Sequence, residues 1–353
     1  VTASGPAGLK QLRGDAVILT MGCRERTRGA LAIPGSRPAG IYTAGVAQEY
    51  INLRNLMVGR EVVILGSGDI GMIMARRMTL EGAHVKAVYE VQPYPSGLPR
   101  NIEQCLNDYG IPLYLSHTVT DIHGRARLEA VTVSQVDERL RPIPGTEERV
   151  ECDTLILSVG LIPAGDIANG SGLAVDGRTR GAFVDEHYQT SIPGVYAIGD
   201  MIPGAQLAHA ASAQGMVLAE LLAGQEPSVD LSVVPGCVYT EPEIASAGLD
   251  EETAKAQGIP VRTGKFIMSA NGKSLISKEE RGFIKVVVHE ETEEILGAQM
   301  MCGRATDMIG EFVSAISNHL TASQVLRAMR PHPTYNEGVA EALEELEGGA
   351  IHV

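Results

Sequence analysis

A histidine between two prolines, with a glutamate five residues later, is the pattern in this sequence that most directly suggests acid–base chemistry. The segment reads RPHPTYNE, with His332 between Pro331 and Pro333 and Glu337 after them. The prolines restrict the backbone and favour extended conformations around the histidine. A nearby carboxylate stabilises the protonated imidazole and fixes its tautomer, as a general base near neutral pH requires. We therefore predict His332 as a catalytic acid/base and Glu337 as the residue that orients it.

The same glutamate has a purely structural interpretation. Thr334 and Glu337 have the spacing of a capping box, in which each side chain bonds the other residue's backbone amide at a helix start. A helical pattern follows, with apolar residues at Val339 and Leu343. A cap of this kind stabilises a helix by about 1 kcal/mol. His332 would then be a surface residue, although capping and orientation can coexist in Glu337.

A second segment has the pattern of a dinucleotide site. EVVILGSGDIGMIMARRMTLEGAHVKAVYE contains an apolar strand, then Gly66, Gly68 and Gly71 in G-x-G-x-x-G spacing, then a helical pattern and a second strand that ends at Glu90. The first glycine permits a tight turn, the second lets a pyrophosphate approach the backbone, and the third lets helix and strand pack closely. The helix N-terminus adds partial positive charge for the phosphates. The alternative is a glycine-rich turn in a plain α/β unit.

Glu90 stands where a carboxylate would accept hydrogen bonds from an adenosine ribose. It would repel a 2′-phosphate, and the three residues after it include no arginine to compensate. The segment therefore favours NAD over NADP. In the helix between the two strands, the residues expected to form the apolar face are Ile70, Ile73, Met74 and Met78.

Two further segments resemble each other and flank this unit. DAVILTMG and DTLILSVG, residues 15–22 and 153–160, share an aspartate, a buried-strand run and a glycine at identical spacing. Each predicts a short parallel strand that ends in a tight turn. We expect them to mark the exit from, and the return to, a domain that surrounds the nucleotide unit, although chance would also produce such a pair.

The rest of the chain predicts a third strand with an acidic end and a separate α+β unit. TSIPGVYAIGD contains a short strand that ends at Gly199 and Asp200, where ligands bind in an open α/β sheet, although Asp200 would serve equally well as a helix cap or turn residue. From about residue 233, strands are expected at 283–289 and 295–301 as a hairpin. Helices are expected at 307–318, 323–329 and 336–347.

The totals exclude several classes of protein. The chain has 353 residues and a net charge of −14, which argues against nucleic-acid binding. No run is long enough for a membrane span, and no secretory signal is recognisable. The five cysteines have neither metal-site nor disulfide-framework spacing, so we expect no metal site and a reducing, cytoplasmic location.

Taken together, these motifs resemble the FAD-dependent pyridine nucleotide–disulfide oxidoreductases. The order is strand–Gly, glycine-rich insert, strand–Gly, TSIPGVYAIGD, AHAASAQG, YTEPEIASAGLDEETAKAQG and HPTYNE. From about Gly172 onward the sequence is similar to dihydrolipoamide dehydrogenases. The middle, from Met21 to about Val136, more closely resembles FAD oxidoreductases of the hydrogen cyanide synthase or amine dehydrogenase type, which use no redox disulfide.

The resemblance implies an α/β fold in which a Rossmann-like NAD domain is inserted in a partial FAD domain and is followed by an α+β dimer-interface domain. The expected boundaries are 1–58 and 153–232 for the two FAD segments, 59–152 for the NAD domain and 233–353 for the dimerisation domain.

The resemblance also implies roles for individual residues. Asp200 would bind the ribityl chain of FAD, and Ala208 and His209 would lie near the flavin, with Gly160 and Gly199 also at the cofactor. His332 would deprotonate a dithiol substrate. In that family the base serves the disulfide of the partner subunit, which implies a homodimer. The substrate would be a lipoyl dithiol, within a 2-oxoacid dehydrogenase-type complex.

The sequence also departs from the family pattern. The family begins with its own FAD-binding G-x-G-x-x-G unit and a C-x4-C redox pair, and neither is found here. The family's acidic residue in the NAD helix falls at Ile73. We expect the missing segment to have been removed, to lie on another polypeptide, or to have been lost from the gene.

Three functions follow in order of preference. The first is a dihydrolipoamide dehydrogenase-type enzyme that passes electrons from a dithiol through a disulfide and FAD to NAD⁺. The second is an NAD-linked FAD oxidoreductase without a redox disulfide, acting on an amine or small metabolite. The third is a non-catalytic, nucleotide-binding dimer module.

Overall fold

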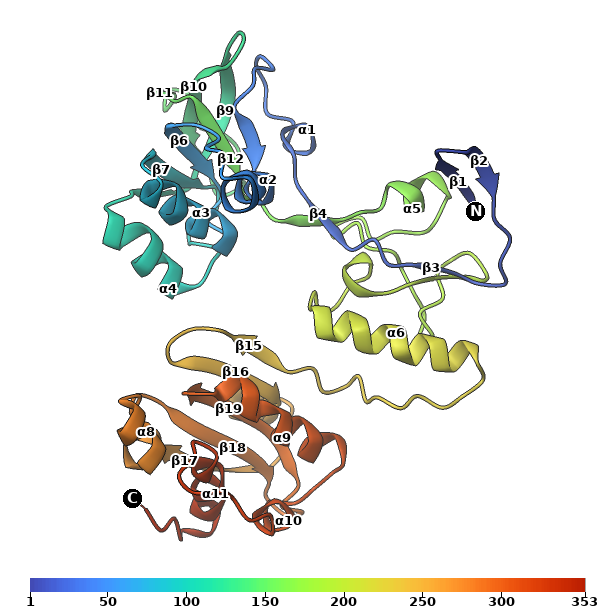
Figure 1. Ribbon diagram of the computed structural model, residues 1–353, viewed down its shortest axis with the longest axis vertical. Coiled ribbons are helices and arrows are strands. Elements are labelled where there is room, and N and C mark those ends of the chain that lie inside the picture. The colour runs from blue at the N-terminus through green and yellow to red at the C-terminus, as the bar shows by residue number, and fades with distance from the viewer. Residues whose placement is uncertain (353) are drawn as a thin grey trace. The chain divides into compact units, whose positions relative to one another are not determined.

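The computed structural model describes residues 1–352, which divide into two compact units. The first unit comprises Val1–Gly204 and the second begins at Ala205. Figure 1 shows the elements of both, and each unit is described by itself.

The main sheet of the first unit is parallel and has five strands in the order β5-β12-β6-β7-β8. Its strands are β5 (Ile41–Thr43), β6 (Glu61–Leu65), β7 (His84–Glu90), β8 (Leu113–Leu115) and β12 (Thr154–Leu157). Helix α3 (Asp69–Leu80) connects β6 to β7, as the glycine motif predicts. The carboxylate of Asp153 joins distant parts of this sheet, because its Oδ1 accepts hydrogen bonds from the amides of Arg60 at 3.0 Å and Glu61 at 3.2 Å.

The two faces of this sheet are covered differently (Figure 1). Alternate strand residues such as Val62 and Ile64 pack against α3 and α2 (Ala44–Gln48). The intervening residues, such as Val63 and Leu65, pack against the antiparallel sheet β9 (His117–Gly124), β10 (Leu128–Gln135) and β11 (Glu148–Glu151). A strand buried on both faces explains the continuous apolar run VVIL in the sequence.

The remaining elements of the first unit are short. Two ribbons lie outside the main sheet: β3 (Val17–Leu19) pairs in parallel with β14 (Val195–Ala197), and β4 (Cys23–Glu25) pairs antiparallel with β13 (Leu161–Pro163). The others are β1 (Thr2–Gly5), β2 (Gly8–Gln11), α1 (Arg28–Leu31), α4 (Pro99–Asn101), α5 (Asp166–Gly170), π-helical segments at Glu49–Leu53 and Ile102–Leu106, and 3₁₀ turns at Asn107–Tyr109 and Gly199–Met201.

Strand pairing and side-chain exposure correct two expectations about the first unit. The segment predicted as the return strand, residues 153–160, forms β12 inside the nucleotide-binding sheet, between β5 and β6. The sheet therefore takes strands from both sides of the predicted 59–152 boundaries. The predicted apolar face of α3 is half wrong, since Ile70 and Ile73 are each 42% exposed, whereas Met72, Met74 and Met78 are buried.

The second unit is built on an antiparallel five-stranded sheet in the order β15-β16-β19-β18-β17. Its strands are β15 (Gly236–Val238), β16 (Glu243–Gly248), β17 (Val261–Ile267), β18 (Phe283–His289) and β19 (Ile295–Cys302). The predicted hairpin at 283–301 is confirmed. Its helices are α6 (Ala208–Leu222), α7 (Glu251–Ala256), α8 (Gly272–Ser277), α9 (Ala305–Ser317), α10 (Ala322–Leu326) and α11 (Glu337–Glu344), with short turns at Met268–Ala270 and Glu345–Glu347. Buried residues of α9 and α11, such as Phe312 and Val339, pack with the strands in one core.

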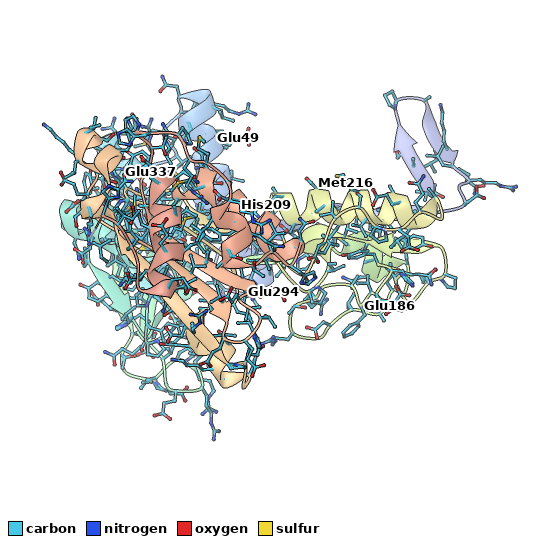
Figure 2. All side chains as sticks on the ribbon, turned by 90° about the horizontal axis from the view of Figure 1, so that it is seen from below. Glu49, Glu186, His209, Met216, Glu294 and Glu337 are labelled. Carbon is cyan, nitrogen blue, oxygen red and sulfur yellow. The ribbon has the colours of Figure 1, made fainter. Side chains whose placement is uncertain are left out.

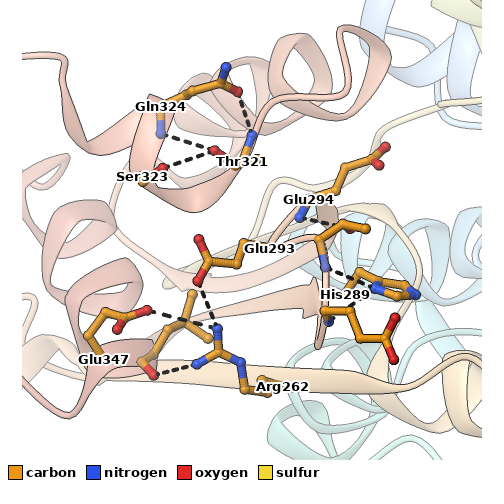
Figure 3. Close-up of polar contacts among 11 residues, drawn as sticks. Arg262, His289, Glu293, Glu294, Thr321, Ser323, Gln324 and Glu347 are labelled. Atoms are coloured by element: carbon orange, nitrogen blue, oxygen red, sulfur yellow. Dashed lines mark hydrogen bonds and ion pairs between the residues drawn. The ribbon is translucent and has the colours of Figure 1, made fainter.

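Polar contacts connect β17, the turn between β18 and β19 and the segment after α11 in the second unit (Figure 3). Arg262 of β17 contacts Glu293 at 3.3 Å and Glu347 at 3.8 Å. A complete capping box starts α10, where Thr321 and Gln324 each bond the other's backbone amide. None of the helices among residues 1–352 is long and apolar enough to cross a membrane.

Candidate functional site

The three motif glycines follow β6 and face the end of β12. A β-carbon on Gly66 would lie 2.1 Å from the carbonyl oxygen of Ser158, and one on Gly71 would lie 2.7 Å from the β-carbon of Ser158. Gly66 also has a φ of +99°, which favours glycine. Gly68 has room for a β-carbon instead, because its nearest neighbours in Ser158 would lie at an ordinary contact distance of 3.6 Å. Gly66 and Gly71 are therefore needed for packing, whereas Gly68 leaves its backbone accessible to a ligand.

Glu90 ends β7 beside this turn, and protein donors fix its carboxylate. Oε2 accepts hydrogen bonds from the amide of Ser67 at 2.9 Å, its hydroxyl at 2.6 Å and the Ser96 hydroxyl at 3.2 Å. Oε1 accepts from the amide of Gln92 at 2.9 Å. Glu90 is 4% exposed, and these donors compensate the cost of burying its carboxylate. Because each carboxylate oxygen has about two acceptor positions, Oε1 can still accept one further hydrogen bond.

A cavity of about 740 Å³ lies over the turn and includes Glu90 in its lining. Its other walls come from the turn itself, the end of β12, and the segments around Ile33 and Thr118. The arrangement fits the pyrophosphate and adenosine of a dinucleotide, since the accessible turn, the α3 N-terminus and the carboxylate all border one cavity. Ser67 and Ser96 were not predicted from the sequence. Their contacts with Glu90 depend on a loop that folds back onto the turn.

The predicted FAD residues of the first unit lie at strand ends. Gly160 follows β12 with a φ of +80° and open space where a β-carbon would be. Gly199 and Asp200 follow β14 in a 3₁₀ turn. The Cys23 thiol donates a hydrogen bond to the Asp200 carbonyl at 3.3 Å. This geometry is compatible with a flavin chain at Asp200, and the assignment stays a prediction.

Ala208 and His209 begin α6 in the second unit. The ring Nε2 of His209, a residue labelled in Figure 2, lies 3.0 Å from the carbonyl of Pro235. Since a carbonyl only accepts, Nε2 carries the proton in this contact. The predicted role of these two residues near a flavin stays a prediction.

The structure brings His332 and Glu337 together. Nδ1 of His332 lies 2.8 Å from Oε1 of Glu337, and the histidine side chain is 76% exposed. Partial burial acts to raise the pKa of Glu337, but the hydrogen bonds from Thr334 and His332 outweigh it and the pKa lies below its ordinary value. The ionised carboxylate accepts only, so Nδ1 must donate the proton, and Nε2 of a neutral ring keeps its lone pair.

The predicted capping box at this helix forms only by half. The Thr334 amide donates to Oε2 of Glu337 at 2.9 Å, but the Thr334 hydroxyl donates to the carbonyl of Pro331 instead of accepting from the helix. The helix begins three residues later than the threonine, with Asn336 as its N-cap. Glu337 thus bonds the loop and the imidazole through different oxygens.

An ion pair between the buried Arg330 and the partly buried Glu311 holds the loop before His332. It was not predicted from the sequence. Arg330 has a side chain 7% exposed and contacts Oε1 of Glu311 in α9 at 2.6 Å. Oε2 of Glu311 accepts from the side-chain amide of Asn336 at 2.7 Å. Glu311 therefore bonds residues on both sides of the histidine, and nothing local in the sequence indicates this long-range contact.

The cysteines of this chain are poorly suited to redox exchange. No disulfide is formed among residues 1–352. Burial raises the pKa of all five thiols, and that of Cys152 and Cys302 to about 12. Because the thiolate is the reactive form, a raised thiol pKa disfavours it. No group of His, Cys, Asp and Glu residues suited to a metal is found within the same described range.

The fold and site define a class, a dinucleotide-binding α/β unit followed by an α+β unit that carries an acid–base pair. Family models identify it further. The model described as pyridine nucleotide-disulphide oxidoreductase matches residues 4–215, and that of the family's dimerisation domain matches residues 234–343. This chain belongs to the pyridine nucleotide-disulphide oxidoreductase family, whose members bind FAD and NAD(P).

Curated relatives agree with this membership. The chain is 32% identical over 292 residues to mitochondrial dihydrolipoyl dehydrogenase of Caenorhabditis elegans, covering 81% of this chain and 58% of that protein. It is 30% identical over 335 residues to dihydrolipoyl dehydrogenase of Geobacillus stearothermophilus, covering 92% and 70%. The likeness therefore includes the middle region, and dihydrolipoyl dehydrogenases use FAD and NAD.

Solved structures share the fold. LpdA of Mycobacterium tuberculosis superposes with a TM-score of 0.73 at 21% identity, covering 98% of this chain and 72% of that one. The flavoprotein disulfide reductase RclA of Escherichia coli gives a TM-score of 0.66 at 23% identity, covering 95% and 74%. The α/β fold with its α+β dimerisation unit is thus confirmed.

Proposed function

We propose that this chain is the nucleotide-binding and dimer-forming part of an FAD-dependent oxidoreductase of the dihydrolipoyl dehydrogenase type. The overall reaction would convert a dithiol and NAD⁺ into a disulfide, NADH and one proton. The hydrogen-bonded pair of His332 and Glu337 is the observation that carries the proposal. It gives a base whose free nitrogen is exposed, in a chain whose curated relatives bear this name. No observation favours the two alternative functions.

The described residues divide the cofactor binding between them. Gly66, Gly68, Gly71 and Glu90 would hold NAD, and the predicted FAD residues are Gly160, Gly199, Asp200, Ala208 and His209. Bound FAD would supply two-electron redox chemistry, and NAD⁺ would supply the hydride acceptor. The accessible backbone at Gly68 supports the first assignment, since a pyrophosphate must approach the chain closely there.

His332 would remove the proton from a substrate thiol. Its Nε2 keeps a lone pair because Glu337 holds the proton on Nδ1. Glu337 would then stabilise the imidazolium that forms. Because the thiolate, not the thiol, attacks a disulfide, this proton transfer would control the first chemical step.

The proposal includes a homodimer and a lipoyl substrate. The match to the dimerisation domain supports the dimer. Dihydrolipoyl groups attached to a 2-oxoacid dehydrogenase-type complex are the proposed source of the dithiol, and the cytoplasm is the proposed location. Analytical ultracentrifugation of the purified protein tests the dimer, since a monomer at micromolar concentration would contradict it.

The central test is an assay of NAD⁺-linked dihydrolipoamide oxidation by the protein as its gene encodes it. His332→Gln should lower kcat by on the order of a hundredfold or more, because general acid–base catalysis typically contributes that much. His319→Gln is the matched control, because His319 is an exposed histidine whose Nδ1 also contacts a glutamate, Glu294, at 2.6 Å. Equal activity in His332→Gln and the control would refute the assignment.

A further inference from the structure

A second, smaller cavity adjoins the nucleotide cavity of the first unit. It has a volume of about 140 Å³ and is lined by Glu25, Asp69, Ile70, Leu161 and four residues that also line the larger cavity, Gly68 and 158–160. Both cavities therefore border the glycine turn and the end of β12. Glu90 borders the large cavity and Glu25 borders the small one.

The strand order explains why the two carboxylates lie on opposite sides of the turn. β6, which leads into the turn, has β7 on one side and β12 on the other. Glu90 ends β7, and the shared wall at 158–160 follows β12. A dinucleotide that crosses the turn with its adenosine at Glu90 must extend its other half toward β12, because the ligand lies across the carboxyl ends of the strands.

Glu25 is held at that end by backbone pairing. It lies opposite Leu161 in the β4–β13 ribbon, and the amide of Arg26 bonds the carbonyl of Gly160 at 3.3 Å. Oε1 of Glu25 accepts from the amide of Gly45 at 2.8 Å. Within residues 1–352 this is the only hydrogen bond that Glu25 accepts, so Oε2 remains able to bind a ligand.

The helix beside this cavity carries a second carboxylate, Asp69, at its first residue. Oδ1 of Asp69 is already bonded by the amide of Leu98 at 2.8 Å and the side chain of Asn101 at 2.7 Å. One turn further along, α3 presents the apolar Ile73. Of the two carboxylates that line the cavity, Asp69 begins α3, whereas Glu25 pairs with Leu161 just beyond the end of β12 and is the acidic group on the β12 side.

We propose that Glu25 binds the nicotinamide riboside half of the pyridine nucleotide. Its Oε2 would accept a hydrogen bond from the carboxamide amino group of the nicotinamide, which donates. The proposal rests on the NAD site described under the proposed function. The negative charge also discriminates between redox states, since the oxidised ring is cationic and the reduced ring is neutral.

The experiment compares NAD⁺, NADH and ADP-ribose, which lacks the nicotinamide, in calorimetric titrations of the protein. Glu25→Gln keeps an oxygen for the Gly45 amide, so it separates ligand binding from support of α2. NAD⁺ affinity should fall on the order of tenfold, the range for one hydrogen bond to a charged group. NADH affinity should fall less, and ADP-ribose affinity should not change.

The control is Glu186→Gln, an exposed glutamate of the same unit (Figure 2). Wild-type affinity for NAD⁺ in Glu25→Gln would overturn the inference, as would an equal loss of ADP-ribose binding with a lowered unfolding temperature, which indicates a structural role. A wild-type protein that binds neither NAD⁺ nor ADP-ribose would instead refute the proposed nucleotide site itself.

Discussion

The three glycines of the nucleotide turn have different physical requirements. Gly66 adopts a left-handed backbone conformation, Gly71 contacts Ser158, and Gly68 leaves room for a ligand. The sequence motif alone predicts a close helix–strand approach at the third glycine. The structure adds that the partner is the end of β12, which lies about 90 residues later in the chain and has no local signal in the motif.

Gly71→Ala should destabilise the fold, whereas Gly68→Ala should not. The added methyl group would lie 2.7 Å from the β-carbon of Ser158, and overpacking costs about 1–3 kcal/mol. The higher helix propensity of alanine offsets only about 1 kcal/mol of this. Urea unfolding measures the difference. Ser158→Gly in the Gly71→Ala background should recover part of the loss, and equal stability of the two alanine variants would contradict the packing explanation.

The candidate site residues that the structure brings together have local spacing in the sequence. The pair His332 and Glu337 is separated by five residues, and Glu90 ends the strand that follows the motif helix. The apolar type of Ile73 predicts burial in α3, but its side chain lies on the exposed side of the helix. Ser67, Ser96 and Glu25 carry no such local pattern, and their positions depend on loops and strand pairing.

At the next scale, the loop with His332 depends on helix α9. Glu311→Gln should lower the free energy of unfolding by about 1–3 kcal/mol, because it leaves the charge of Arg330 buried without its partner. The loop should also become more mobile, which hydrogen exchange of its amides measures. Asp307→Asn is the control on the same helix, because its contact with Arg304 at 3.6 Å is exposed. Equal stability of the two variants would contradict a stabilising role for the ion pair between Glu311 and Arg330.

The tie between α7 and β18 should be sensitive to acid. Hydrogen bonds from Lys255 and Lys285 lower the pKa of Glu251 from 4.5 to about 2. A depressed carboxyl pKa contributes stability that is present above the unfolded value and is lost as pH falls through the folded value. The stability difference between wild type and Glu251→Gln should therefore shrink as pH falls from about 5 to about 2.

Thermal unfolding at a series of pH values checks this expectation. Glu252→Gln, on the same helical turn but exposed, should show no comparable convergence. If the stability difference between wild type and Glu251→Gln stays constant down to acid pH, the lysine contacts do not control the titration of Glu251.

The elements were largely predictable where one local rule decides them. Alternating residues specify the hairpin of β18 and β19, and the glycine motif specifies β6, α3 and β7. Helix starts were harder. Thr334 looks like a cap, but its hydroxyl bonds Pro331, whereas the complete capping box occurs at Thr321 and Gln324. Both segments contain suitable residues, so tertiary contacts decide which pair forms.

At the scale of the molecule, the nucleotide sheet is assembled from distant segments. β5 comes from before the motif and β12 from after it, and Asp153 bonds the start of β6. A fragment of residues 59–152 should therefore fail to fold, because it leaves β6 as an unpaired edge and removes Ser158. A fragment of residues 39–160 should retain cooperative unfolding in circular dichroism. Cooperative unfolding of the shorter fragment would contradict the role of β12.

The late arrival of β12 also affects the protein while it is being made. Strand β6, Glu61–Leu65, leaves the ribosome well before Thr154–Leu157, the strand that lies beside it. At roughly 5–20 residues per second, the roughly 90 intervening residues take about 5–20 s to synthesise. During that interval β6 presents an unpaired apolar edge, which is a template for wrong pairing. The nascent chain is consequently most dependent on chaperones just before β12 emerges.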